Sequence, residues 1–143
     1  MSQAQNFSDG ITRLNPEGVV DASAYGFSQA VVVKGPGHYI HISGQFAGDA
    51  EGNLVGDTME AQMKQTFLNL KRVIDASGGK PEHVVFVRVL IVDHEDRYLA
   101  PLMEEEANLF GSNHPASTLI PVPRLALEGM LFEIEATLFV PDE

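Results

Sequence analysis

Two segments carry hydrophobic residues at the three- and four-residue spacing of an amphipathic helix. The stripe of the first segment consists of Met59, Met63, Phe67, Leu70 and Ile74. This spacing places all five on one helix face. Asp57 is a suitable N-cap with Glu60 three residues later, and Gly78 followed by Pro81 ends the segment. The pattern predicts a helix that buries one face.

A second helix is predicted from about Tyr98 to Phe110, with Asp96 as a possible cap. Its core-facing residues would be Leu99, Leu102, Met103 and Phe110. The run Glu104 to Glu106 is interpreted as a solvated face, because consecutive helical positions fan out by about 100° and do not converge on an ion.

Shorter hydrophobic runs bounded by glycine and proline predict strands. They span residues 11–14, 29–33, 38–45, 84–92, 117–122 and 130–140. The turn-forming stretch 34–37 predicts a hairpin between the second and third strands. The valine-rich run 84–92 predicts a central strand buried on both faces. Arg88 interrupts this run, and two interpretations stay open: a salt bridge, or an anion-binding residue in a pocket.

Two of the strands alternate in a way that separates their faces. In 38–45, Tyr39, His41 and Ser43 share one face, and in the last strand Glu133 and Glu135 lie opposite Phe132 and its neighbours. The order β-β-β-α-β-α-β-β predicts a single α+β domain over residues 1–143, with 1–10 as a flexible N-terminal segment.

Charge and composition narrow the function. The 143 residues carry nine Lys and Arg against twenty Asp and Glu, a formal net charge of −11. Such a surface repels phosphate backbones and anionic lipid, so we expect no nucleic-acid or membrane partner, and ribonuclease activity is disfavoured. The absence of cysteine excludes disulfides and thiolate sites. The N-terminus has no signal-peptide pattern, so a cytoplasmic location is expected.

The chain contains no P-loop, dinucleotide fingerprint, G-x-S-x-G elbow or HExxH motif. His38 and His41 would point to opposite faces of their strand, so no metal site is expected. Three polar stretches remain: Ser43-Gly44-Gln45, Pro115 to Thr118, and Glu133 in the last strand. A glycine at a strand end lets a ligand approach the backbone.

These stretches occur in a particular order. Ser43-Gly44-Gln45 is followed by a helix with Gln62 and Asn69-Leu70, by Gly78-Gly79 and a valine-rich strand, by Asp96-Arg97-Tyr98, by Phe110-Gly111 and Pro115-Ala116, and finally by Glu133-Ile134-Glu135-Ala136. This order resembles the RidA/YjgF family of reactive-intermediate deaminases, formerly called L-PSP endoribonucleases, over about residues 26 to 140.

The resemblance implies a chorismate-mutase-like fold, a mixed sheet with two helices packed on one face. It also implies a homotrimer with small-molecule pockets between subunits. Enzymes of the family hydrolyse enamines and imines without a metal or organic cofactor, so no cofactor is expected.

Carried over residue by residue, the resemblance implies Glu133 as the group that holds or activates water. The ligand would contact Ser43, Gly44, Ser117, Thr118, Phe27 and Met103. Three positions depart from the deaminases. Ser117 replaces the arginine that grips the substrate carboxylate, Phe27 replaces a tyrosine, and an asparagine of the second helix falls on Leu102 or Met103.

A serine cannot neutralise a carboxylate as an arginine fork does. We therefore expect a more apolar or neutral ligand than a small 2-imino acid, unless Arg88, Arg124 or His114 supplies the missing charge. Two classes of function stay open: a hydrolase acting on an imine, enamine or related C–N bond, and a trimer that binds a metabolite or regulates without turnover.

Overall fold

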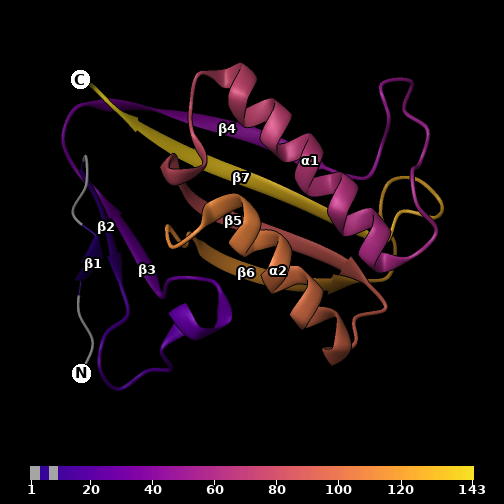
Figure 1. Ribbon diagram of the computed structural model, residues 1–143, viewed down its shortest axis with the longest axis horizontal. Coiled ribbons are helices and arrows are strands. Elements are labelled where there is room, and N and C mark those ends of the chain that lie inside the picture. The colour runs from indigo at the N-terminus through magenta and orange to yellow at the C-terminus, as the bar shows by residue number, and fades with distance from the viewer. Residues whose placement is uncertain (1–3, 7–9) are drawn as a thin grey trace.

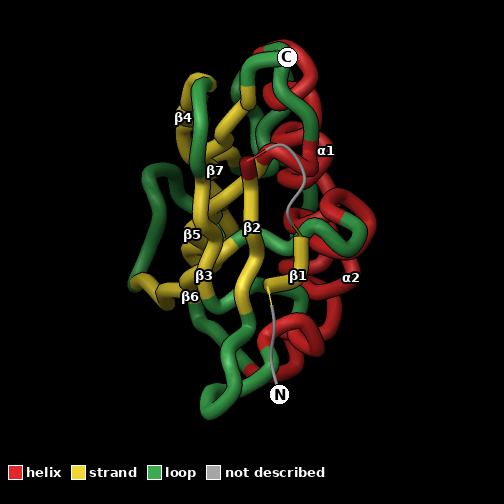
Figure 2. The backbone as a smooth tube through the Cα atoms, turned by 90° about the vertical axis from the view of Figure 1, so that its left-hand side faces the viewer, coloured by secondary structure: helices red, strands yellow, loops and turns green. Residues whose placement is uncertain are grey.

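In the computed structural model, which describes residues 4–6 and 10–143, two helices cover one face of a four-stranded sheet (Figures 1 and 2). The sheet order is β4-β7-β5-β6. Its strands are β4 (Gly37–Gln45), β7 (Phe132–Pro141), β5 (Val84–Val92) and β6 (Ala116–Val122). β7 is antiparallel to β4 and β5, whereas β5 and β6 are parallel. The predicted α+β fold with a mixed sheet and two helices on one face is confirmed.

A smaller antiparallel sheet lies at one end of the molecule, in the order β1-β2-β3 (Figure 1). Its strands are β1 (Ala4–Asn6), β2 (Ile11–Leu14) and β3 (Ala30–Val33). The sequence pattern did not predict β1, and the rest of the expected flexible segment, residues 1–3 and 7–9, lies outside the described residues. Ile11 packs against Val85 and Phe139 of the larger sheet, so the small sheet closes one end of the molecule.

The predicted hairpin across residues 34–37 is wrong. β3 pairs with β2 and β4 pairs with β7, so the chain changes sheets at this point. Gly35 adopts a left-handed φ of 86°, and the carbonyl of Pro36 accepts a hydrogen bond from the amide of Asp142 at 3.1 Å. The corner is therefore held by the end of β7 rather than by a hairpin ladder.

The helices are α1 (Met59–Ser77) and α2 (Leu99–Phe110). Thr58, not Asp57, caps α1, because its hydroxyl accepts a hydrogen bond from the amide of Ala61 at 3.1 Å. Gly78 ends α1 in the left-handed conformation, as predicted. No side chain caps α2; Asp96 begins a short 3₁₀ turn (Asp96–Tyr98).

The main core lies between the helices and the four-stranded sheet. It joins the predicted stripe of α1 to alternate residues of the central strands, among them Val87, Val89, Phe132 and Ile134. Leu99 was expected in this core, but it is 41 % exposed. The opposite face of β5 is only half-buried at Phe86, Arg88 and Leu90, so burial on both faces does not hold within one chain.

Two side-chain amides of α1 hold the loop after β4 and the loop before β7. Gln62 is buried and donates to the carbonyls of Gly56 and Gly129 at 3.1 and 3.0 Å, while its oxygen accepts from the amide of Leu131. Asn69 donates to the carbonyls of Phe46 and Gly48 at 2.9 and 2.8 Å. Because buried backbone carbonyls need a donor, these side chains fix the path of the chain after β4 and before β7.

Candidate functional site

The predicted site residues fall on two faces of the large sheet. Ser117 is in register with Val87 of the core, so its side chain lies on the helix-covered face. Thr118 is in register with Arg88 and lies on the opposite, open face. The helix-covered face also holds Phe27 and Met103, whereas Ser43, Gly44 and Glu133 belong to the open face. A single chain therefore does not bring all seven together.

The helix-covered group lines a pocket of about 600 Å³. Its lining consists of Tyr25, Phe27, Val89, Asp96, Leu99, Ala100, Leu102, Met103, Glu106, Ser117 and Leu119. Helix α2 and the 3₁₀ turn before it, strands β5 and β6, and the segment before β3 supply these side chains. Most are hydrophobic, which is typical of a small-molecule site with few polar groups.

The segment that carries Phe27 is held on both sides. Gly26 ends a 3₁₀ turn (Ala22–Tyr25) in the left-handed conformation, with a φ of 85°. The next residue but one, Ser28, is buried; its amide donates to the carbonyl of Pro115 at 2.9 Å and its hydroxyl to that of His114 at 2.6 Å. Phe27 is thereby fixed beside the start of β6, where Ser117 lies.

Glu106 is the one strongly buried ionisable group in this pocket, with 5 % of the residue exposed. Among the described residues it has no hydrogen-bond or ion-pair partner, and burial raises the pKa of its carboxyl to about 8. The expectation that residues 104 to 106 form a solvated face is therefore wrong at Glu106. The signal was present in the sequence: Leu102, Glu106 and Phe110 recur every four residues and form the buried stripe of α2.

None of the described cations lines the pocket. Arg88 pairs with Glu135 on the open face at 2.9 Å, so the salt-bridge interpretation of Arg88 is confirmed. Arg124 donates to the carbonyl of its neighbour Leu125 at 3.0 Å. His114 lies beside Arg13, and burial together with this guanidinium lowers the pKa of its imidazole. Within one chain, therefore, no described residue supplies a cation to the pocket around Ser117.

On the open face, a β-bulge at Ser43 and Gly44 lies opposite Glu135, and the side chain of Glu133 lies against Gly44. The register between β4 and β7 shifts after Ile42, so these two residues leave the regular ladder. A β-carbon on Gly44 would overlap the carboxylate of Glu133. The glycine thus lets the carboxylate lie directly against the bulged backbone.

The environment of Glu133 favours retention of its proton. Partial burial raises the pKa of its carboxyl, and the negative charge of Glu135 adds to the increase. Glu135 itself forms an ion pair with Arg88 at 2.9 Å. A carboxyl with a raised pKa, placed against a bulged backbone, is suited to exchange a proton with a bound water.

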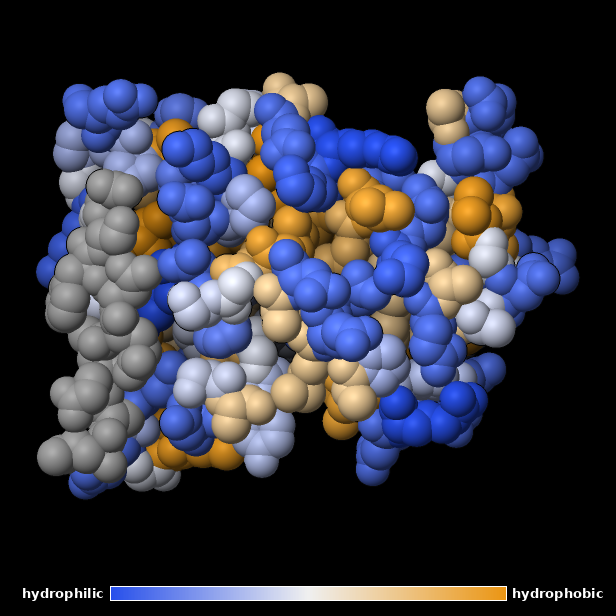
Figure 3. Space-filling model, in the orientation of Figure 1, coloured by the Kyte–Doolittle hydropathy of each residue, from blue (hydrophilic) through white to orange (hydrophobic). Residues whose placement is uncertain are grey.

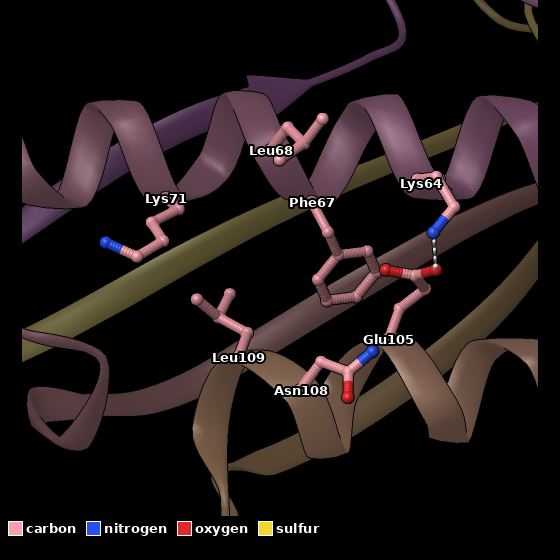
Figure 4. Close-up of a pocket in the computed structure, with 7 residues that line it drawn as sticks. All are labelled: Lys64, Phe67, Leu68, Lys71, Glu105, Asn108 and Leu109. Carbon is pink, nitrogen blue, oxygen red and sulfur yellow. Dashed lines mark ion pairs between the residues drawn. The ribbon is translucent and has the colours of Figure 1, made fainter.

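A second hollow, of about 360 Å³, lies between the two helices (Figures 3 and 4). Phe67 and Leu109 point into it, and Lys64 of α1 faces Glu105 of α2 with 3.9 Å between their charged atoms. None of the predicted site residues lines this groove. Within the described ranges there is no cluster of metal-ligating side chains and no helix long and apolar enough to cross a membrane.

Known proteins share the sequence pattern and the fold of this chain. The sequence model of the family described as Endoribonuclease L-PSP matches residues 20–140. The chain therefore belongs to this family, which is the RidA/YjgF family.

Individual relatives give more detail. A crystal structure of YyfB from Yersinia pestis, a protein of unknown function of the Rid family, is 36 % identical and has a TM-score of 0.86, covering 92 % of this chain and 99 % of that one. A RutC family protein of Pyrococcus abyssi is 32 % identical over 77 % of this chain and 83 % of its own length. A 2-iminobutanoate/2-iminopropanoate deaminase of Dermatophagoides farinae is 30 % identical over 80 % of this chain and 85 % of its own length.

Proposed function

We propose that this protein hydrolyses an imine, enamine or related C–N bond in a substrate other than a small 2-imino acid. The observation that carries the proposal is the pocket around Ser117, which is largely apolar and has no described cation in its lining. A ligand carboxylate would lose its hydration there and gain no opposite charge. This desolvation costs roughly several kcal/mol of binding free energy. Membership in a family with an imine deaminase supports the reaction type.

In this proposal Glu133 holds and activates the attacking water. Its carboxyl lies beside the bulge at Ser43 and Gly44, with a raised pKa. The Ser43 and Thr118 hydroxyls would orient the ligand, while Phe27, Met103 and Ser117 would enclose it. Proton transfer by a positioned carboxylate contributes about 10²- to 10⁴-fold to a rate.

The proposal includes a homotrimer with the ligand at subunit interfaces. In such an assembly the open face of one chain would lie against the pocket of the next, so that Glu133 and Ser117 act on one ligand. Tyr39 and Ile120 support this, because both are large hydrophobic residues exposed on the open face. We propose no nucleic-acid or membrane partner, in line with the net charge of −11.

The test is ammonia release from a panel of imines generated by amine oxidases and amino-acid oxidases. We expect faster release from imines without a carboxylate, and loss of this acceleration in Glu133→Ala. Unchanged activity in Glu133→Ala would contradict the role of that carboxylate.

A second candidate function is metabolite binding without turnover. The separation of Glu133 from the Ser117 pocket, on opposite faces of the sheet in one chain, favours it. It predicts thermal stabilisation by a ligand with no product formed.

A further inference from the structure

Glu106 occupies a position where the fold calls for a hydrophobic side chain. Its neighbours on the buried stripe of α2 are Leu102 and Phe110, both in the main core. A buried carboxyl with no partner among the described residues destabilises the folded protein. A buried polar residue that no partner in the fold stabilises is typical of a functional site.

The surroundings direct this carboxyl to the pocket rather than to the protein. One of its oxygens lies over Gly26, 3.3 Å from where a β-carbon at that position would be, and the side chain of Met103 lies beside the same glycine. Any larger residue at Gly26 would therefore press on the carboxyl. Glu106 lines the cavity together with Leu102, Met103 and Leu119.

The other titratable groups of the lining are Asp96 and Tyr25, and both residues are exposed. Arg88 and Arg124 bond to groups outside the pocket, and His114 is not part of its lining. Within one chain, a buried ligand therefore meets one buried acidic group and no described opposing charge. Such a cavity fits a ligand with an apolar body and one basic nitrogen. It disfavours a ligand carboxylate, which would face Glu106.

We propose that Glu106 binds the nitrogen of the ligand and donates a proton to it, so that the pocket selects imines and amines with an apolar body and no carboxylate. The O–H bond of the carboxyl breaks and an N–H bond forms on the nitrogen, which leaves a carboxylate paired with an iminium or ammonium cation. Protonation makes an imine carbon a better target for water. The inference rests on the proposed function and names its substrate class.

The high pKa of Glu106 supports this role, because the carboxyl still holds its proton at neutral pH when the pocket is empty. Transfer to a nitrogen base then replaces an unpartnered acid by a charge-assisted hydrogen bond, which is the stronger interaction.

Stable probes of one shape test the inference without turnover: benzylamine, benzyl alcohol and phenylacetate, with binding followed by NMR titration. We expect wild type to bind benzylamine at least about tenfold more tightly than either other probe, in line with a charge-assisted bond. Glu106→Gln should abolish this preference and keep the weak binding of benzyl alcohol. Glu104→Gln is the matched control, since Glu104 is an exposed acid on the same helix.

Three outcomes would overturn the inference. Equal binding of benzylamine and benzyl alcohol by wild type is the first. An equal loss in Glu104→Gln would point to the overall negative charge instead. Loss of binding of all three probes in Glu106→Gln, with Glu106→Met giving the same result, would assign Glu106 a structural role.

The proposed hydrolase can fail separately. Absence of ammonia release from any imine, with the benzylamine preference intact, would overturn the proposed hydrolase and leave the binding site at Glu106 standing.

Discussion

The two carboxyls with raised pKa lie in contrasting parts of the molecule. Glu106 is enclosed between α2 and the sheet, and burial alone raises its pKa. Glu133 is half-buried on the open face, where burial and the charge of Glu135 both raise its pKa, and Glu135 is paired with Arg88. The first site has one acid and hydrophobic walls, and the second has a small charged network next to a bulge. In our proposal the first site binds and protonates the ligand nitrogen, and the second activates water.

Removing the acid on the open face gives the largest expected effect. Glu133→Gln should lower the rate of imine hydrolysis by about 10²- to 10⁴-fold, because the general base is lost. The matched control is Glu135→Gln, which changes a neighbouring acid of the same strand. Ammonia release measures both, and an equal loss in the two variants would mean that the whole network, not Glu133, carries the activity.

Removing the buried acid should change how stability depends on pH. The native Glu106 has a pKa of about 8 against an ordinary value of 4.5, so between these values the native state binds a proton that the unfolded state has lost. Stability therefore falls as pH rises through this window. We expect wild type to lose on the order of 2–4 kcal/mol more than Glu106→Gln between pH 5 and pH 8.5.

Chemical denaturation at several pH values measures this difference. The expectation concerns the change with pH, because a buried glutamine has a pH-independent cost of its own. Parallel curves for wild type and Glu106→Gln would show that the carboxyl ionises freely in the folded protein.

Adding a cation should reverse the selectivity of the pocket. Ser117→Arg places a guanidinium among hydrophobic walls and near Glu106, which it would also pair with. We expect the double variant Ser117→Arg, Glu106→Gln to bind phenylacetate about 10- to 100-fold more tightly than wild type does. An NMR titration is the measurement, and unchanged binding would place position 117 outside the ligand site.

The smallest effect is expected at the bulge. Gly44→Ala should displace the Glu133 carboxylate that lies against this glycine, and so lower hydrolysis by up to about tenfold. Stability should stay within about 1 kcal/mol, because the half-exposed Glu133 side chain can turn away. Full activity in this variant would show that Glu133 does not need its position against the bulge.

Local patterns predicted most of the fold. The stripe from Met59 to Ile74 and the alternation from Phe132 to Leu138 each point to one buried face, and both are buried as expected. The errors lie where distant contacts decide. Whether Lys34–Gly37 forms a hairpin depends on Asp142 and on the partners of β3, which are remote in sequence.

The candidate site was predictable only in part. The order of short motifs led to Phe27, Met103 and Ser117, which do line one pocket. Glu106 was assigned to solvent with its two acidic neighbours, although its spacing from Leu102 and Phe110 marks the buried stripe. Residue type outweighed periodicity in that interpretation, and a buried unpaired acid is the exception that only three-dimensional packing reveals.

The central claim is that the pocket takes a nitrogen base without a carboxylate. It is tested most directly by ammonia release from two imines that differ only in this group, one formed from 2-phenylethylamine by an amine oxidase and one from phenylalanine by an amino-acid oxidase. The account predicts that the protein accelerates hydrolysis of the first at least about tenfold more than that of the second. A preference for the imine that bears the carboxylate would contradict it.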